Sequence, residues 1–471
     1  MINMASSQLN ENIDRGQWTG RIGFILAAAG SAIGLGNIWR FPYSVAEGGG
    51  GLFVIIYLFF VLVIGLPVLL AELSLGRASQ RNPVGAFKAM IPGKFWPYVG
   101  GLGVLTGGGI LAFYSVIAGW TLGYLGKSVS GTLSQAVDGE SSGQIFSSFV
   151  ADPTWPVILS GIFLLITFFV VRGGVAKGIE RATTLLMPAL FVLLLALAVR
   201  ALTLPNGMEG LIYLFTPDWS KLSLNVVMGA LGQALFSLSL GMGAMITYGS
   251  YASKKENLWK SGIFIATADT GIALLAGLII FPTLFFASAD PQAGPGLVFV
   301  VLPTIFNQMP FGSVVAMAFF SLLGIAALTS TVSLLEVVVS YFVDEKGWSR
   351  HTASITIAGA CFLLAIPSAL AFGASPQLSG GDDSILPFGL DFLSLNNNIW
   401  GNYSLSIGAF LICVGVAWFW GIPKFLSALE DGHSQIFPMP GRQIVGLLVK
   451  IICPLAVLTV LIFIIATGNY F

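Results

Sequence analysis

The sequence predicts an all-α polytopic membrane protein with about eleven transmembrane helices. Of its 471 residues, 56% are hydrophobic and only 9% are charged, whereas an ordinary soluble domain carries about 25% charged residues. Charge-poor apolar runs recur along the chain, and a run of about 20 such residues spans a bilayer as a helix. This composition excludes a soluble enzyme, a nucleic-acid-binding protein and a disordered scaffold. The balance of 21 basic and 21 acidic residues gives no net charge that would attract a polyanion.

The apolar runs define eleven expected spans. They are 21–46, 51–76, 96–126, 154–172, 182–203, 224–250, 260–289, 311–343, 351–372, 398–420 and 443–468. The segments 129–153 and 374–391 are rich in serine and glycine, which is typical of loops. Cys361, Cys413 and Cys453 each lie inside an apolar run, so we expect buried thiols and no disulfide framework. The polar first twenty residues do not resemble a cleavable signal peptide.

Basic residues predict the orientation of the spans. Sixteen of the 21 lysines and arginines fall before the first span, at its start, or after an even-numbered span. Acidic residues such as Asp138, Asp152 and Asp290 fall in the opposite loops. Because positively charged loops remain in the cytoplasm, we expect a cytoplasmic N-terminus and, with an odd number of spans, an extracytoplasmic C-terminus.

Two spans are interrupted at their centres by glycine and polar residues. Span one contains AAAGSAIGLGNIWRFP over residues 27–42, and span six contains GQALFSLSLGMGAMITYGSY over residues 232–251. The two breaks are five spans apart, as expected if spans one to five and six to ten are inverted structural repeats. Such a pair of interrupted segments is the best indication in a sequence of a transporter's binding site.

The backbone at these breaks is expected to bind a ligand. Unpaired amides and carbonyls are costly in hydrocarbon, so unwound backbone persists only where it lines a cavity or meets a ligand. Half-helix N-termini favour an anionic group and freed carbonyls favour a small cation. The alternative is that the glycines are only packing contacts, which is our interpretation of residues 99–110. The serine and asparagine residues at the two breaks favour a site.

These segments resemble the neurotransmitter:sodium symporter family (solute carrier 6) over nearly the whole chain. GSAIGLGNIWRFP is similar to the family's first-span signature, SLSLGMGAMITYGSY to its sixth, and ALTST with Glu336 to its eighth. KGIERATTLLMP and TPDWSKL match as well. Within the family the chain resembles bacterial amino acid transporters that have eleven spans and a methionine in the sixth-span pocket, the type that carries many hydrophobic amino acids.

The resemblance implies a leucine-transporter-type fold in the inner (plasma) membrane of a bacterium. This fold is a 5+5 inverted repeat with broken helices 1 and 6. The expected divisions are a cytoplasmic segment (1–20), the first repeat (21–203), an outer loop (204–223), the second repeat (224–420), a cytoplasmic loop (421–442) and a last span with the C-terminus (443–471).

Two sodium sites are implied by the resemblance. The first would use the Ala32 carbonyl, Asn37, Ser237 and Asp269, together with the carboxylate of the substrate. The second would use the carbonyls of Gly30, Ile33 and Ala326 and the hydroxyls of Thr329 and Ser330. Oxygen donors without thiols or imidazoles suit a hard cation. Taken alone, the two hydroxyls could instead bond to carbonyls of their own helix.

The implied substrate site has a wall formed by Ser31, Leu35, Gly36, Ile110, Tyr114, Phe236, Ser237, Ser239, Met242, Ser330 and Leu334. Amine-transporting relatives carry aspartate where this chain has Gly34, so the implied substrate is an amino acid that brings its own carboxylate. That carboxylate would meet the first sodium ion and the Tyr114 hydroxyl, and the ammonium would meet unwound carbonyls. The apolar wall predicts hydrophobic side chains, with aromatic ones left open, because Met242 is pliable. The alternative is that Met242 is an ordinary packing residue.

Asp269 departs from the family's usual pattern. Many relatives carry asparagine there, and chloride-dependent members bind the anion close by. Tyr57, Gln233 and Ser237 match chloride-site positions, but Ala273 stands where relatives carry serine or glutamate. Because an acid inside a membrane is a functional candidate, we expect Asp269 to supply the negative charge and chloride not to be needed.

Gates are implied on both sides of the substrate site. The outer ion pair would join Arg40 and Asp391, with Tyr114 and Phe236 as an aromatic lid beneath it. The acidic loop before Asp391 leaves Asp382 and Asp383 as alternative partners for Arg40. The inner ion pair would join Arg15 and Asp344, surrounded by Trp18, Ser250 and Tyr251.

Two further acids, Glu72 and Glu336, lie inside spans and have no evident basic partner in the sequence. We expect Glu72 to accept hydrogen bonds from freed amides of the broken sixth span. For Glu336 we expect a structural role or a protonated carboxyl.

Together these features predict sodium-coupled symport of an amino acid by alternating access, with membrane lipid as the other expected partner and no nucleic acid. A membrane enzyme is the rival from another class, but the two histidines fall in loops and no HExxH or other catalytic pattern occurs. A non-transporting amino-acid sensor on the same fold remains an alternative.

Overall fold

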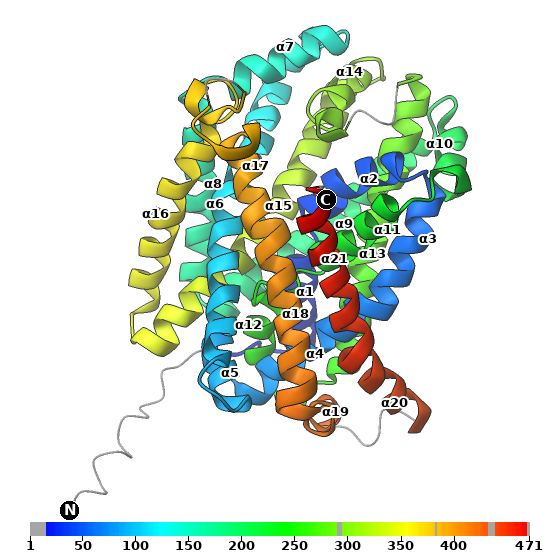
Figure 1. The fold of residues 1–471 in the computed structure, drawn as a ribbon. Helices are drawn as coiled ribbons and strands as arrows, with labels where there is room; N and C mark the ends of the chain where they lie inside the picture. The colour runs from blue at the N-terminus through cyan, green and yellow to red at the C-terminus, as the bar shows by residue number, and fades with distance from the viewer. Residues whose placement is uncertain (1–15, 290–293, 382–383, 432–438, 469–471) are drawn as a thin grey trace, which may run out of the picture.

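The computed structural model describes residues 16–289, 294–381, 384–431 and 439–468, which form a bundle of long helices (Figure 1). Within these ranges, nine helical runs are long and apolar enough to cross a membrane. They are α3–η2–α4 (Gly51–Ser79), α6 (Trp96–Val129), α8 (Trp155–Arg172), η4–α9 (Val175–Leu202), α13 (Leu258–Phe286), α15 (Gly312–Lys346), α16 (Arg350–Ala369), α17 to α19 (Phe392–Glu430) and α20 to α21 (Gly441–Thr467).

Two further spans are broken, where the sequence predicts. The first consists of α1 (Arg21–Ala32), a π-helical turn η1 (Gly36–Arg40) and α2 (Phe41–Glu47), with a bend of 49° at the break. The second consists of α11 (Leu224–Ser237) and α12 (Ala244–Ser250), with a non-helical segment between them. With the first broken pair counted as one span, the described residues contain ten membrane-crossing runs, and α11 is a shorter apolar helix at the place of the expected sixth span.

Several segments expected to be loops contain short helices. These are α5 (Pro83–Met90), α7 (Gly139–Val150), α10 (Gly207–Phe215), α14 (Val301–Asn307) and α19 (Ile422–Glu430). The expectation that 129–153 is irregular is therefore wrong. Asp138 and Ser141 form a capping box that starts α7: the Asp138 carboxylate accepts from the Ser141 amide (2.8 Å) and the Asp138 amide donates to the Ser141 hydroxyl (3.1 Å). The segment 374–391 has only short 3₁₀ turns, as expected of a loop.

The boundaries of two spans also differ from expectation. The fifth begins at Val175 rather than 182, because a π-helical turn η4 (Val175–Glu180) precedes α9 (Arg181–Leu202). The tenth begins at Phe392 rather than 398, because Asp391 caps the short helix α17 (Phe392–Asn396). It continues through η9 (Asn397–Ser404), α18 (Leu405–Val414) and η10 (Gly415–Gly421).

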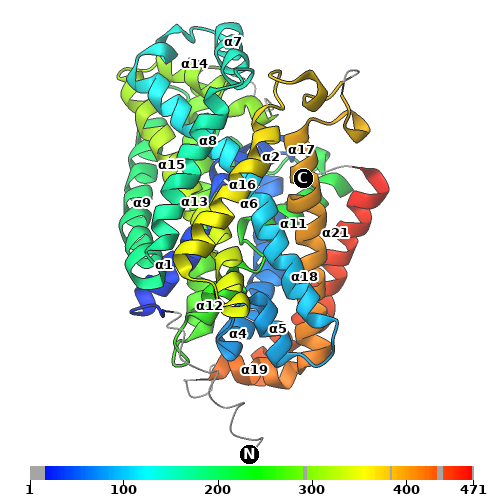
Figure 2. The same cartoon turned by 90° about the vertical axis from the view of Figure 1, so that its left-hand side faces the viewer.

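The two broken spans lie at the centre of the bundle. Figures 1 and 2 show α7 and α14 at one end of the molecule and α5 and α19 at the other, with α1 and α12 enclosed by the longer helices. The helix α15 is buried along most of its length and packs against both α1 and α6. The three cysteines are buried and unpaired, as predicted.

Candidate functional site

The two breaks face each other across the middle of the bundle and are joined by polar contacts. The Ser239 hydroxyl donates to the Ser31 carbonyl (2.8 Å), and the Gln233 side-chain amide donates to the Gly36 carbonyl (2.9 Å). Buried carbonyls freed by the first break are thus partly satisfied by side chains of the second, as a break inside a membrane requires.

The backbone of the second break is held open by a neighbouring helix. Ser239 (φ 54°) and Gly241 (φ 81°) are in the left-handed region, which ends the helical hydrogen-bond pattern. A Cβ at Gly241 would also collide with the Leu405 carbonyl oxygen. The buried Glu72 carboxylate, on α4 (Leu66–Ser79), accepts a hydrogen bond from the Gly241 amide (2.7 Å). The role expected for Glu72 is confirmed.

A small cavity of about 30 Å³ lies between the breaks. Its lining residues are Ser31, Ala32, Gly34, Gly36, Ile110, Tyr114, Phe236, Ser237, Ser239, Met242, Ser330, Ser333 and Leu334. Every residue predicted for the substrate wall lines it except Leu35, whose amide donates to the Tyr114 hydroxyl (2.9 Å). Leu35 instead lines a larger neighbouring cavity. Ser333 was not predicted, although it lies one helical turn after Ser330 on the same face of α15.

The cavity has a polar end and an apolar end. The Ser31 hydroxyl is buried and has no hydrogen-bond partner among the described residues, and the Tyr114 hydroxyl accepts from the Leu35 amide. At the other end, Ile110, Met242 and Leu334 present only apolar or thioether surface. This combination suits a ligand with a charged head and a hydrophobic side chain.

A first cluster of oxygens surrounds Asp269, on α13, which is completely buried. The Asn37 amide nitrogen donates to the Asp269 carboxylate (2.7 Å), the Asp269 carbonyl (3.1 Å) and the Ser237 hydroxyl (3.0 Å). The Ser237 hydroxyl donates to the other carboxylate oxygen (2.6 Å), and the Tyr57 hydroxyl lies 3.5 Å from it. The structure thus brings together the three side chains predicted for the first sodium site, and Ala32 lines the cavity beside them.

A second cluster joins α15 to the first break. The Thr329 hydroxyl lies 3.0 Å from the Ala326 carbonyl oxygen and 3.4 Å from that of Ile33. The Ser330 hydroxyl lies 3.3 Å from the same Ile33 oxygen. Gly30 faces Thr329 closely, since an added Cβ would lie 3.3 Å from the Thr329 Cβ. All five residues predicted for the second site are therefore neighbours.

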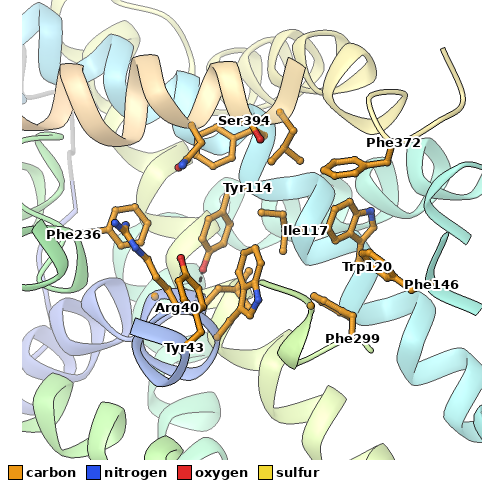
Figure 3. Close-up of a pocket in the computed structure, with 17 residues that line it drawn as sticks. Arg40, Tyr43, Tyr114, Ile117, Trp120, Phe146, Phe236, Phe299, Phe372 and Ser394 are labelled. Carbon is orange, nitrogen blue, oxygen red and sulfur yellow. Dashed lines mark hydrogen bonds between the residues drawn. The ribbon is translucent and has the colours of Figure 1, made fainter. Parts of the chain in front are cut away.

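A vestibule of about 300 Å³ adjoins the small cavity on the side nearer α7 and shares Gly36, Tyr114 and Phe236 with it. Figure 3 shows Arg40 beside Phe236, and Trp120, Phe146 and Phe372 on the opposite wall. The Arg40 guanidinium lies 4.8 Å from the centroid of the Phe236 ring. Tyr114 and Phe236, predicted as an aromatic lid, thus line both cavities.

The expected outer ion pair is not formed in this structure. The described residues show no ion pair between Arg40 and Asp391, because the Asp391 carboxylate caps α17. It accepts from the Ser394 amide (2.8 Å) and the Ser394 hydroxyl (2.6 Å). Asp382 and Asp383, the alternative acidic partners predicted for Arg40, lie outside the described residues.

Trp18 and Tyr251, both predicted for the inner gate, are buried and lie against each other. The Trp18 indole donates to the Tyr248 carbonyl (3.0 Å), and its ring lies edge-on to that of Tyr251. Of the predicted inner pair, Arg15 lies outside the described residues. The Asp344 carboxylate accepts from the backbone and side-chain amides of Asn82 (3.0 and 3.1 Å).

The interpretation of Glu336 as an acid without a basic partner is wrong. Its buried carboxylate forms a salt bridge with the half-buried Arg350 and accepts from the Tyr251 hydroxyl (2.6 Å). Arg350 follows the turn after α15, and its guanidinium also donates to the Val171 carbonyl (2.9 Å). The pair was missed because the two residues are on consecutive helices that fold back on each other.

A cavity between two broken spans, flanked by clusters of oxygen donors in the middle of a helical bundle, defines a membrane transporter. The chain belongs to the sodium:neurotransmitter symporter family, whose sequence profile matches residues 15–141 and 146–470. Its structure is similar to the crystal structure of MhsT in complex with L-phenylalanine, with a TM-score of 0.87. The two sequences are 44% identical, and the match covers 95% of this chain and 99% of that chain.

Other relatives agree with this assignment. The uncharacterized sodium-dependent transporter YhdH of Bacillus subtilis (strain 168) is 37% identical over 418 residues, 89% of this chain and 91% of that protein. The human sodium- and chloride-dependent creatine transporter 1 is 29% identical over 476 residues, 88% of this chain and 72% of that protein. These comparisons confirm the predicted family and the leucine-transporter-type fold. The protein is a sodium-dependent integral membrane transporter, and its relatives are transporters rather than enzymes.

Proposed function

We propose that this protein carries hydrophobic L-amino acids, aliphatic and aromatic, into the cell together with two sodium ions and without chloride. The observation that carries the proposal is the small cavity between the two breaks. Its polar end is formed by backbone and hydroxyl groups of the breaks, and its opposite end is apolar. The resemblance to a protein crystallised with L-phenylalanine supports the same substrate class.

The substrate's carboxylate would meet the Tyr114 hydroxyl, and its ammonium would lie near the Ser31 hydroxyl and the carbonyls of the second break. Gly34 supports a carboxylate-bearing substrate, because a Cβ there would lie 2.5 Å from the Ser330 Oγ and 2.8 Å from the Tyr114 hydroxyl. A side chain that could replace a substrate carboxylate would have to displace the Ser330 and Tyr114 hydroxyls at that position. The side chain of the substrate would then face Ile110 and Met242, and thioethers adapt to varied shapes.

The oxygen clusters support two sodium ions. At the first cluster, three oxygen atoms of Ser237 and Asp269 lie within 3.1 Å of the Asn37 side-chain nitrogen. If the amide turned to present its own oxygen, a small cation would find four oxygen donors there, including one carboxylate. At the second cluster, the Thr329 and Ser330 hydroxyls and the Ile33 and Ala326 carbonyls supply a further set of hard donors.

Two sodium ions would make uptake strongly concentrative. Each elementary charge that crosses 100 mV releases about 2.3 kcal/mol, and each tenfold gradient adds about 1.4 kcal/mol per ion. The total of about 7 kcal/mol could hold a substrate ratio on the order of 10⁵. One ion would still support a ratio of about 10²–10³.

We further propose that the end carrying α7 and α14 faces the outside of the bacterial inner membrane, with the N-terminus in the cytoplasm. The positively charged loops support this orientation. Arg40 lines the vestibule on that side, and Asp391 caps α17, whose Leu393 and Ser394 line it. These two residues would then form the outer gate when the vestibule closes. Arg15 and Asp344, with Trp18 and Tyr251, would form the inner gate.

Uptake into proteoliposomes tests this function. We expect radiolabelled L-phenylalanine and L-leucine to accumulate above equilibrium with an inward sodium gradient, and equally well when gluconate replaces chloride. Accumulation that did not depend on sodium would contradict the coupling. A severe loss of uptake in gluconate would contradict chloride independence. Amino-acid binding without accumulation would favour the alternative that the protein is a non-transporting amino-acid sensor.

A matched pair of variants tests the second sodium site. Thr329→Val removes a hydroxyl from the cluster, and we expect uptake to fall at least tenfold and the sodium half-saturation to rise. Thr331→Val is the control, because its hydroxyl faces Leu328 and Thr167 instead. Equal effects of the two variants would contradict the assignment of Thr329.

A further inference from the structure

A groove of about 870 Å³ lies on the outside of the bundle, between α6, α15, α16 and the start of the tenth span. Figure 2 looks toward this side of the molecule, where α16, α6 and α18 run next to one another. Small residues of α6 line the groove, among them Gly101, Gly108 and Ala112, and large apolar residues such as Leu105 and Leu364 stand at its edges. Leu105 and Leu364 are 62% and 60% exposed.

The groove is elongated and lies at membrane depth. Its lining on α6 extends from Pro97 to Ala112, a rise of about 22 Å at 1.5 Å per residue. That is roughly two thirds of the hydrocarbon core of a bilayer, which is about 30 Å thick. Apart from α5, which contributes Val84, every helix that forms its walls is part of a membrane span, so most of the groove faces lipid tails rather than water.

One end of the groove is positively charged. Tyr341, which lines the groove, has the Lys346 ammonium 5.9 Å from its ring centroid, and Lys94 is exposed three residues before Pro97. Neither lysine forms an ion pair with a described residue, whereas the two acids at this end have other partners: Glu345 lies 4.0 Å from Lys88, and Asp344 accepts from Asn82. Two available ammonium groups at the end of an apolar groove match a phosphate attached to a hydrocarbon chain.

We propose that this groove binds one acyl chain of an anionic membrane phospholipid, with its phosphate beside Lys94 and Lys346. The site is distinct from the substrate cavity but shares its helices. On α6, Ile110 faces the substrate cavity while Gly108 and Ala112 face the groove; on α15, Leu334 faces the cavity and Val338 the groove. The bound chain fills the space between α6 and α16 and stabilises the helices that support the substrate site.

Two glycines allow a matched test of the apolar part. An added Cβ at Gly101, in the groove, or at Gly359, on α16 outside it, would meet no atom within 4 Å. Native mass spectrometry of the purified protein should show one retained phospholipid per chain for the wild type and for Gly359→Phe. The retained fraction should fall at least fivefold for Gly101→Phe. Ala360→Phe, at another exposed position of the groove, should act like Gly101→Phe if the latter does not fold.

The charged end is tested by the double variant Lys94→Gln/Lys346→Gln. Palmitoyl-oleoyl-phosphatidylglycerol should raise the melting temperature of the wild type in detergent more than phosphatidylcholine with the same chains does, and the double variant should lose at least two thirds of that difference. Equal lipid retention by Gly101→Phe, Ala360→Phe and the wild type would overturn the proposal. So would a wild-type dimer that Gly101→Phe converts to a monomer, since a second copy of the chain would then occupy the groove.

Discussion

Replacing Asp269 by asparagine removes the one negative charge from the first oxygen cluster. In the structure this carboxylate accepts from Asn37 (2.7 Å) and Ser237 (2.6 Å) and is completely buried. A sodium ion about 4 Å from it would be attracted by about 4 kcal/mol at an effective dielectric constant of 20. Because each 1.4 kcal/mol is a tenfold change, the sodium half-saturation of Asp269→Asn should rise about 10²–10³-fold.

The assay is a sodium titration of L-phenylalanine uptake, in chloride and in gluconate. For Asp269→Asn we expect chloride to restore part of the activity, because the anion can replace the lost charge next to the Tyr57 hydroxyl. Asp218→Asn is the control, since it removes the same charge from a solvent-exposed turn where the carboxylate only accepts from Ser220 (3.0 and 2.6 Å). A sodium half-saturation for Asp269→Asn within twofold of the wild type would refute the reasoning.

Three further changes should separate substrate recognition from stability. Gly34→Ala should lower uptake at least tenfold without lowering the yield of monodisperse protein, because its methyl group would lie 2.5 Å from the Ser330 Oγ; normal uptake would contradict this crowding. Glu336→Gln should destabilise the protein by about 1–3 kcal/mol, because the half-buried Arg350 guanidinium would lose its charged hydrogen-bond partner. An unchanged melting temperature in detergent would argue against that. Met242→Phe narrows the apolar end of the cavity, so competition assays should show a larger loss of affinity for phenylalanine than for alanine; equal losses would place Met242 outside the site.

The sequence was most informative where it departs from a regular membrane helix. Glycines and serines inside apolar runs indicate both breaks, and the breaks supply eight of the thirteen residues of the cavity wall, the other five being on α6 and α15. Leu35 is the one predicted wall residue that does not line the cavity, because a residue at a break can turn its side chain away while its amide remains in the site. Ser333 was missed because a serine in a membrane helix is usually bonded to its own helix, as its hydroxyl is here to the Ser330 carbonyl (2.8 Å).

Features that depend on how loops fold back could not be predicted from composition. The helix α7 is rich in serine and glycine, so only its capping residues Asp138 and Ser141 indicate a helix. The partner of Glu336 is on the next helix, and its distance in the sequence does not show that the two side chains meet. Asp391 could either pair with Arg40 or cap α17. The structure shows the helix cap, because the Ser394 amide lies within the same turn and donates to the Asp391 carboxylate.

The hydrogen bond from the Gly241 amide to Glu72 has a consequence for biosynthesis in the membrane. The half-helices α11 and α12 have 14 and 7 residues, or about 21 and 10 Å, so neither crosses a hydrocarbon core of about 30 Å alone. We therefore expect the translocon to release them together, with the polar segment between them still exposed to lipid. The carboxylate that accepts the Gly241 amide belongs to a helix synthesised some 170 residues earlier. Glu72, the hydrogen-bond acceptor, is therefore synthesised before the Gly241 amide that donates to it.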